Sequence, residues 1–169
     1  MKDVSDTLSY GGRGELSTSL GEWGFSLHQD TDVSNTQVGI DFRYDGFIGF
    51  WNESVMITSD NIDTIMITMG ADYTLPIANG VLIMTESMFI SSNQNTTTPD
   101  QTFTAFMVSL PVGMFHNVML ISSLDWDENN IYNYLRMSTT FDSFSINCMA
   151  SINPKEVGSS IQLMFIYNH

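Results

Sequence analysis

The chain has 169 residues, enough for one domain with a sizeable core, and a net charge of −14 with only five basic residues. This balance excludes nucleic acid as a partner, because binding phosphates requires clustered lysine and arginine. Charged residues make up 14% of the chain, against about 25% in ordinary soluble domains, while the hydrophobic share is 43%. The polar surface is therefore mostly uncharged, as in a membrane barrel with a hydroxyl-rich interior.

Residues 1–12 are polar and glycine-rich and are interpreted as a leader or loop. From residue 13 to residue 169, apolar and polar side chains alternate, which predicts strands, because successive side chains of a strand point to opposite faces. No stretch has a helical period, so we expect one antiparallel β domain. In chain order, its predicted strands are 13–20, 23–28, 37–45, 47–58, 62–75, 81–90, 103–110, 118–126, 131–140, 143–152 and 160–167.

The final strand is the most apolar. Ile161, Leu163, Phe165 and Tyr167 share one of its faces. Such a strand needs a neighbouring edge and an apolar environment. We hypothesise that the environment is a lipid bilayer and that the neighbouring edge closes a barrel. Most of the predicted strands have lengths close to the roughly 9–11 residues of a tilted transmembrane strand.

The predicted connections alternate in length along the chain. Longer polar loops are expected at 29–36, 59–61, 91–102, 127–130 and 153–159, and shorter turns at 21–22, 45–46, 76–80, 111–117 and 141–142. Two connections depart from the contrast, because 59–61 is short for a loop and 111–117 is long for a turn. Outer-membrane barrels have long loops outside and short turns on the periplasmic side. Because the last strand would end in the periplasm, this alternation favours a barrel of that kind.

Two stretches, Gly70-Ala71-Asp72-Tyr73-Thr74-Leu75-Pro76-Ile77-Ala78-Asn79-Gly80 and Leu124-Asp125-Trp126-Asp127, together with the last strand, resemble the C-terminal part of bacterial outer-membrane β-barrel proteins of the porin type. The resemblance implies an all-β, antiparallel up-and-down transmembrane β-barrel, with about 11–12 strands in this chain. It implies membrane lipids as surroundings, assembly machinery that recognises the last strand, and the option of a homo-oligomer. Residues 1–6 lack the apolar segment of a signal peptide, so we expect that signal to have been removed or to lie upstream.

Charged side chains within the strands are expected on the inner face, because a charge facing lipid at mid-depth costs about 2–4 kcal/mol. The predicted lumen-lining residues are Asp41, Arg43, Asp45, Glu53, Asp72, Glu86 and Arg136. Their excess of carboxylates indicates a passive channel for small solutes or ions that favours cations. The alternative is that these charges link neighbouring strands inside a narrow or plugged barrel.

Aromatic side chains near strand ends would suit the two membrane interfaces. These are Trp23, Tyr44, Tyr73, Phe103, Trp126, Tyr132 and Tyr167. The twelve methionines are interpreted as adaptable packing. Cys148 is alone, so no disulfide forms within the chain, and its place on an apolar strand predicts a buried side chain.

No catalytic residue, metal ligand or cofactor is predicted. The histidines lack the spacing of a metal site, and chance explains the pair Ser26 and His28 better than catalysis does. Two other functions remain open: a soluble lipocalin-like barrel or sandwich that binds an apolar ligand, and a barrel with an adhesive role for the loop at 91–102.

Overall fold

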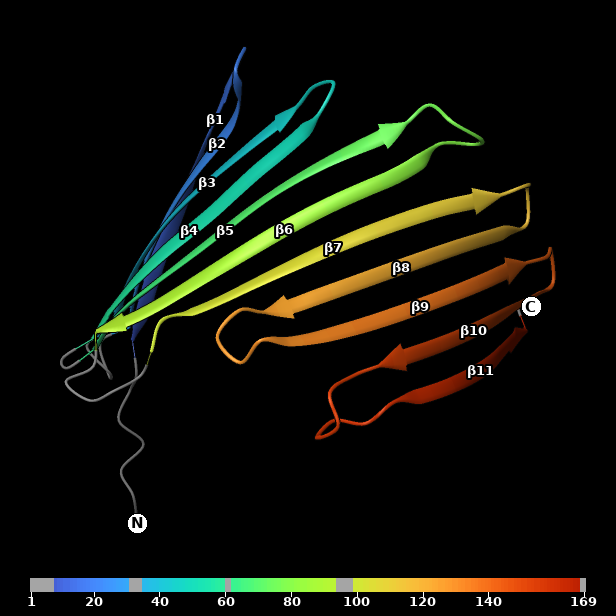
Figure 1. The fold of residues 1–169 in the computed structure, drawn as a ribbon. Coiled ribbons are helices and arrows are strands. Elements are labelled where there is room, and N and C mark those ends of the chain that lie inside the picture. Colours follow the sequence, from blue (N-terminus) through green and yellow to red (C-terminus); the bar gives the residue numbers. More distant parts are fainter. Residues whose placement is uncertain (1–7, 31–34, 60–61, 94–98, 168–169) are drawn as a thin grey trace. The chain divides into compact units, whose positions relative to one another are not determined.

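The structure, a computed structural model, describes residues 8–30, 35–59, 62–93 and 99–167. Every regular element among these residues is a strand (Figure 1). The strands are β1 (Ser9–Thr18), β2 (Gly21–Asp30), β3 (Asn35–Asp45), β4 (Gly49–Ser59), β5 (Ile62–Leu75), β6 (Val81–Asn93), β7 (Gln101–Val112), β8 (His116–Asp125), β9 (Asn130–Thr140), β10 (Phe144–Ile152) and β11 (Ser160–Tyr167).

The strands form one antiparallel, up-and-down sheet in which each strand is hydrogen-bonded to its neighbour in the chain. The predicted all-β, antiparallel fold is confirmed, but the sheet is not closed into a barrel. Closure requires a ladder between the two end strands, and within the described residues β1 pairs only with β2 and β11 only with β10.

The chain divides into two compact units. Unit 1 comprises Met1–Met69 and Met88–Gln101, and unit 2 comprises Gly70–Ser87 and Thr102–His169. Strands β5 and β6 contribute residues to both. Each unit is described by itself below.

Unit 1 has one apolar face and one charged face. Its register pairs Trp23 with Phe42 and Phe25 with Ile40 on the apolar face. The side chains between them along each strand point the other way. The apolar face carries Leu16, Trp23, Phe25, Leu27, Val38, Ile40, Phe42, Tyr44, Phe50 and Met56.

Unit 2 repeats this division in β7 to β11. The register aligns Leu120 with Leu135, then Leu135 with Ala150, and Ala150 with Ile161 on its apolar face. The opposite face carries Arg136 and Asn147 among serine, tyrosine and methionine side chains. The predicted alternation of the last strand is confirmed, because Ile161, Leu163, Phe165 and Tyr167 all lie on the apolar face.

The apolar faces are exposed and do not form a packed core. Among the described residues, Val81 is the one hydrophobic side chain that counts as buried, whereas Val38 is 52% exposed and Phe165 is 70% exposed. Cys148 is also exposed, so its predicted burial is wrong. The reason is that, in the part of the chain that the structure describes, all strands belong to one sheet and no second layer covers this face of β10. Among the described residues, no helix is long and apolar enough to span a membrane.

The first hairpin differs from its prediction at both ends. Strand β1 begins at Ser9, so residues 9–12, which were predicted as leader or loop, form strand pairs with β2. The turn lies at 19–20 and not at 21–22, because the Thr18 hydroxyl accepts a hydrogen bond from the Leu20 amide (3.2 Å) and donates one to the Gly21 carbonyl (2.9 Å). Such hydroxyl-to-backbone bonds are a common way to fix a tight turn.

The short connections lie close to their predicted places. They occupy 19–20, 46–48, 76–80, 113–115 and 141–143. The connections at 126–129 and 153–159, both predicted as longer loops, are also present, but 126–129 is no longer than the turn at 76–80. The predicted loops at 29–36, 59–61 and 91–102 fall in part outside the described residues.

Candidate functional site

The candidate site is the charged face of unit 1, which we call the acidic face. By register, Asp41 lies opposite Glu53, and Arg43 lies opposite Glu22. The two arginines are outnumbered by carboxylates. The acidic face comprises Arg13, Glu15, Glu22, Asp41, Arg43, Asp45 and Glu53.

At the centre of this face, Arg13 binds Asp41 through two hydrogen bonds. Arg13 Nη1 donates to Asp41 Oδ2 and Arg13 Nη2 donates to Asp41 Oδ1, each at 2.8 Å. The Nε atom of Arg13 also donates to Glu15 Oε1 at 3.0 Å. Two parallel bonds of this kind are among the strongest side-chain contacts, because both partners are charged and the geometry of both groups matches.

This bridge crosses a complete strand, and a glycine makes room for it. Arg13 lies on β1 and Asp41 on β3, while Gly24 of the intervening strand β2 is paired with Asp41. A Cβ atom at residue 24 would collide with both oxygens of the Asp41 carboxylate and would lie 2.6 Å from Arg13 Nη2. The missing side chain is therefore what allows the two charged groups to meet above β2.

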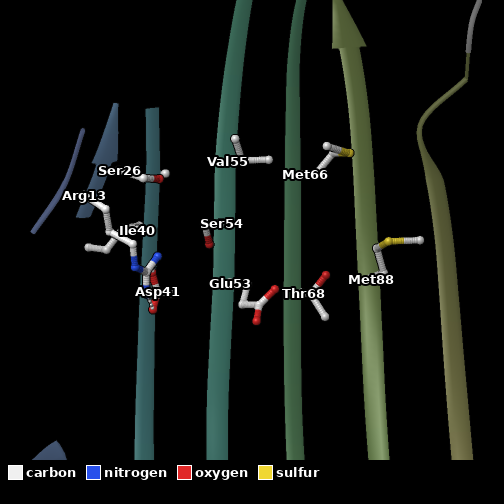
Figure 2. A pocket seen from close by; sticks show the side chains of 11 residues that line it. Arg13, Ser26, Ile40, Asp41, Glu53, Ser54, Val55, Met66, Thr68 and Met88 are labelled. Atoms are coloured by element: carbon white, nitrogen blue, oxygen red, sulfur yellow. Dashed lines mark hydrogen bonds and ion pairs between the residues drawn. The ribbon is translucent and has the colours of Figure 1, made fainter. Parts of the chain in front are cut away.

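The bridge lies between two hollows in the acidic face. The larger hollow, of about 400 Å³, extends from the bridge across β4 to Met66, Thr68 and Met88 (Figure 2). The smaller, of about 250 Å³, extends along the strands toward Glu22 and Arg43. Arg13 and Asp41 line both hollows.

Three more of the predicted lumen residues accompany Asp41 on the acidic face. Glu53 lines the larger hollow, and Arg43 lines the smaller. Arg43 Nε donates to Asp45 Oδ1 at 3.0 Å, in an exposed ion pair at the end of β3. Pairs this exposed contribute little to stability.

The remaining predicted residues belong to unit 2. Arg136 donates from Nε (3.2 Å) and Nη2 (2.7 Å) to Oδ1 of Asn147, which is only 3% exposed. The Ser87 hydroxyl contacts the Thr104 hydroxyl at 2.9 Å, and the register places Thr104 on the apolar face. Its chain neighbour Glu86 therefore lies on the opposite, polar face. Asp72 lies in the part of β5 that belongs to unit 2.

The aromatic residues predicted for membrane interfaces do not all lie on the apolar faces. Trp23 packs on Phe42 with ring centroids 4.4 Å apart on the apolar face, and Tyr44 and Tyr167 lie on apolar faces as well. In contrast, the register places Phe103 and Tyr132 on the face that carries Arg136. For those two residues the prediction is wrong, because it used their closeness to strand ends and not their register.

Other aromatic residues form a stack that the sequence did not reveal. In unit 2, Phe141 lies between Phe115 and Phe144, with centroid distances of 5.7 and 4.6 Å. The stack joins two neighbouring turns, at 113–115 and 141–143.

Arg13 and Gly24 are the important members of the site that the sequence did not identify. The alternation along β1 could have indicated that Arg13, Glu15 and Ser17 share a polar face. It could not have indicated that Arg13 binds Asp41, 28 residues further along the chain. Asn147 was also missed, since an asparagine in a strand gives no signal of a buried arginine contact.

No protein-family model, characterised protein or solved structure matches this chain. Within the described ranges, no group of three or more histidine, cysteine, aspartate or glutamate side chains is placed to hold a metal ion.

Proposed function

We propose that this chain is an integral outer-membrane β-barrel protein that acts as a porin-like passive channel with an acidic lumen. The observation that carries the proposal is the division of each unit into an exposed apolar face and a polar face, with no packed core among the residues that the structure describes. A soluble sheet would have to cover the apolar side chains with a second layer. A bilayer supplies that cover directly, because lipid tails surround an outward-facing apolar band.

The charged face of unit 1 supports its role as the inner surface. Its side chains converge: Arg13 reaches Asp41 across β2, and both line hollows on that face. The excess of carboxylates over arginines would attract cations into the lumen.

The two end strands would complete the barrel. Both β1 and β11 have one hydrogen-bonded neighbour in the described sheet, and unpaired strand edges are not tolerated in hydrocarbon. We propose that these edges pair with each other or with further strands. The exposed apolar face of β11 suits lipid and the barrel-assembly machinery of a bacterial outer membrane, and a homo-oligomer is compatible with this arrangement.

Reconstitution tests the proposal. The purified chain should require detergent, should migrate differently on gels before and after heating, and should give conductance steps with cation preference in planar bilayers. Solubility without detergent would contradict the membrane assignment and favour a lipocalin-like binder. Membrane insertion without conductance would contradict the channel and leave a barrel of structural role.

A further inference from the structure

The larger hollow of the acidic face contains a carboxylate without a partner. Glu53 lies directly opposite Asp41, and within the described residues no hydrogen bond or ion pair reaches its side chain (Figure 2). Both oxygens of Asp41, by contrast, accept bonds from Arg13. The local cation is therefore occupied, and Glu53, an exposed residue at the wall of the hollow, remains a negative charge without a protein partner among the described residues.

The surrounding charges favour a cation at Glu53. Arg13 is shared between Asp41 and Glu15, so these three groups together already have one more carboxylate than cation. Like charges directly opposite each other on neighbouring strands are unfavourable. A cation beside Glu53 would relieve its repulsion with Asp41 and would gain from both carboxylates.

The walls of the hollow indicate what kind of cation fits. Opposite the Arg13–Asp41 bridge, the hollow is bounded by Met66 and Met88, with Val55 beside Glu53 on β4 (Figure 2). Methionine is flexible and polarisable and adapts to apolar groups of varied shape. A small metal ion holds its water tightly and gains little from such walls, whereas an alkyl group gains from each apolar contact.

We propose that the hollow binds a small alkyl-substituted ammonium ion, with Glu53 as the counter-charge and Met66, Met88 and Val55 around the alkyl groups. Its volume of about 400 Å³ is within the range of small-molecule sites, about 300–1,000 Å³. The inference rests on the proposed function, since it names the solute class that would be held on the channel's inner face.

Calorimetric titration of the full chain in detergent, with tetraethylammonium chloride as the probe, tests the proposal without requiring conductance. We expect saturable binding, and weaker binding of potassium chloride under the same conditions. Glu53→Gln should raise the Kd for tetraethylammonium by about two- to fivefold, as expected for an exposed ion pair. The matched control is Glu156→Gln, the same chemical change in the exposed loop at 153–159, which should leave the Kd unchanged.

Two further variants separate charge from packing. Glu53→Asp keeps the charge and should bind with intermediate affinity, which also guards against a folding defect in Glu53→Gln. Met88→Gln keeps the length of the side chain but not its apolar character, and should raise the Kd for tetraethylammonium about threefold while leaving that for potassium unchanged.

The outcomes distinguish this inference from the proposed function. Unaltered tetraethylammonium affinity in Glu53→Gln, or potassium binding as tight as that of tetraethylammonium, overturns the hollow as an organic-cation site. Conductance without tetraethylammonium binding also overturns the organic-cation site, but leaves the proposed channel function intact. If tetraethylammonium binding depends on Glu53 but the chain never conducts, the organic-cation site is supported and the channel function is overturned.

Discussion

Arg13 and Asp41 lie on strands that are not neighbours, yet their guanidinium and carboxylate groups meet at 2.8 Å through two hydrogen bonds above Gly24 of the strand between them. The bridge therefore links β1 directly to β3, in addition to the backbone hydrogen bonds that join β1 to β2. It also divides the acidic face into two hollows, so that the same contact affects both stability and the path along that face.

Gly24→Ala should displace the bridge and lower the stability of the protein slightly, because the new methyl group would occupy the space of the bridge and the exposed Arg13 and Asp41 side chains would have to move apart. Unfolding by urea in detergent micelles measures the change. Gly14→Ala is the matched control, since a Cβ atom at residue 14 meets nothing within 4 Å. Equal stability of the two variants would mean that the bridge is not held in this place.

Arg13→Gln should increase cation preference in planar bilayers, because it removes a positive charge from the acidic face and leaves the Asp41 carboxylate uncompensated. The reversal potential in a salt gradient reports this change. Arg13→Lys keeps the charge while losing the paired geometry, and should retain the preference of the original chain. A decrease in cation preference on loss of Arg13 would place the acidic face outside the conduction path.

Val38→Arg should reduce insertion into lipid vesicles, with a cost of about 2–4 kcal/mol if the residue lies at mid-depth. Val38 is 52% exposed on the apolar face, so the same change in a soluble protein would cost little. The adjacent Gln37 lies on the other face of β3 and supplies the control Gln37→Arg. Folding yield into vesicles should fall for the first variant only, and equal yields would argue against lipid contact at Val38.

Asn147→Leu should destabilise the chain by about 1–3 kcal/mol, because it removes the oxygen that accepts both Arg136 hydrogen bonds. Asn147→Asp keeps an oxygen acceptor and adds a negative charge, so it should be at least as stable as the original. Urea midpoints of the two variants measure the difference. If the leucine variant matched the aspartate variant, the Arg136 contact would have no energetic role.

The strands could be predicted from sequence because the alternation of side chains directly reflects the geometry of a half-exposed strand. In 37–45 the apolar and charged positions are regular enough to assign both faces, and the structure places Asp41 and Arg43 together on one of them. The breaks in this alternation also predicted seven connections within a few residues of where the structure describes them.

Register is what alternation alone does not determine. The Thr18 hydroxyl shifts the first turn relative to its predicted place, and pairing then sets Gly24 beside Asp41. A contact such as that of Arg13 with Asp41 depends on two successive registers, each set by a turn. For the same reason, the faces of Phe103 and Tyr132 could not be assigned from their distance to strand ends.

Among the described residues, Val81 is the one hydrophobic side chain in the buried class, so burial within this sheet supplies only part of the hydrophobic free energy that a packed core would give. Side chains such as Phe165 contribute only when something other than this sheet covers them. Stability is then shared between the polypeptide and its surroundings. Transferring the protein from one solvent to another should change its unfolding free energy more than most single substitutions would.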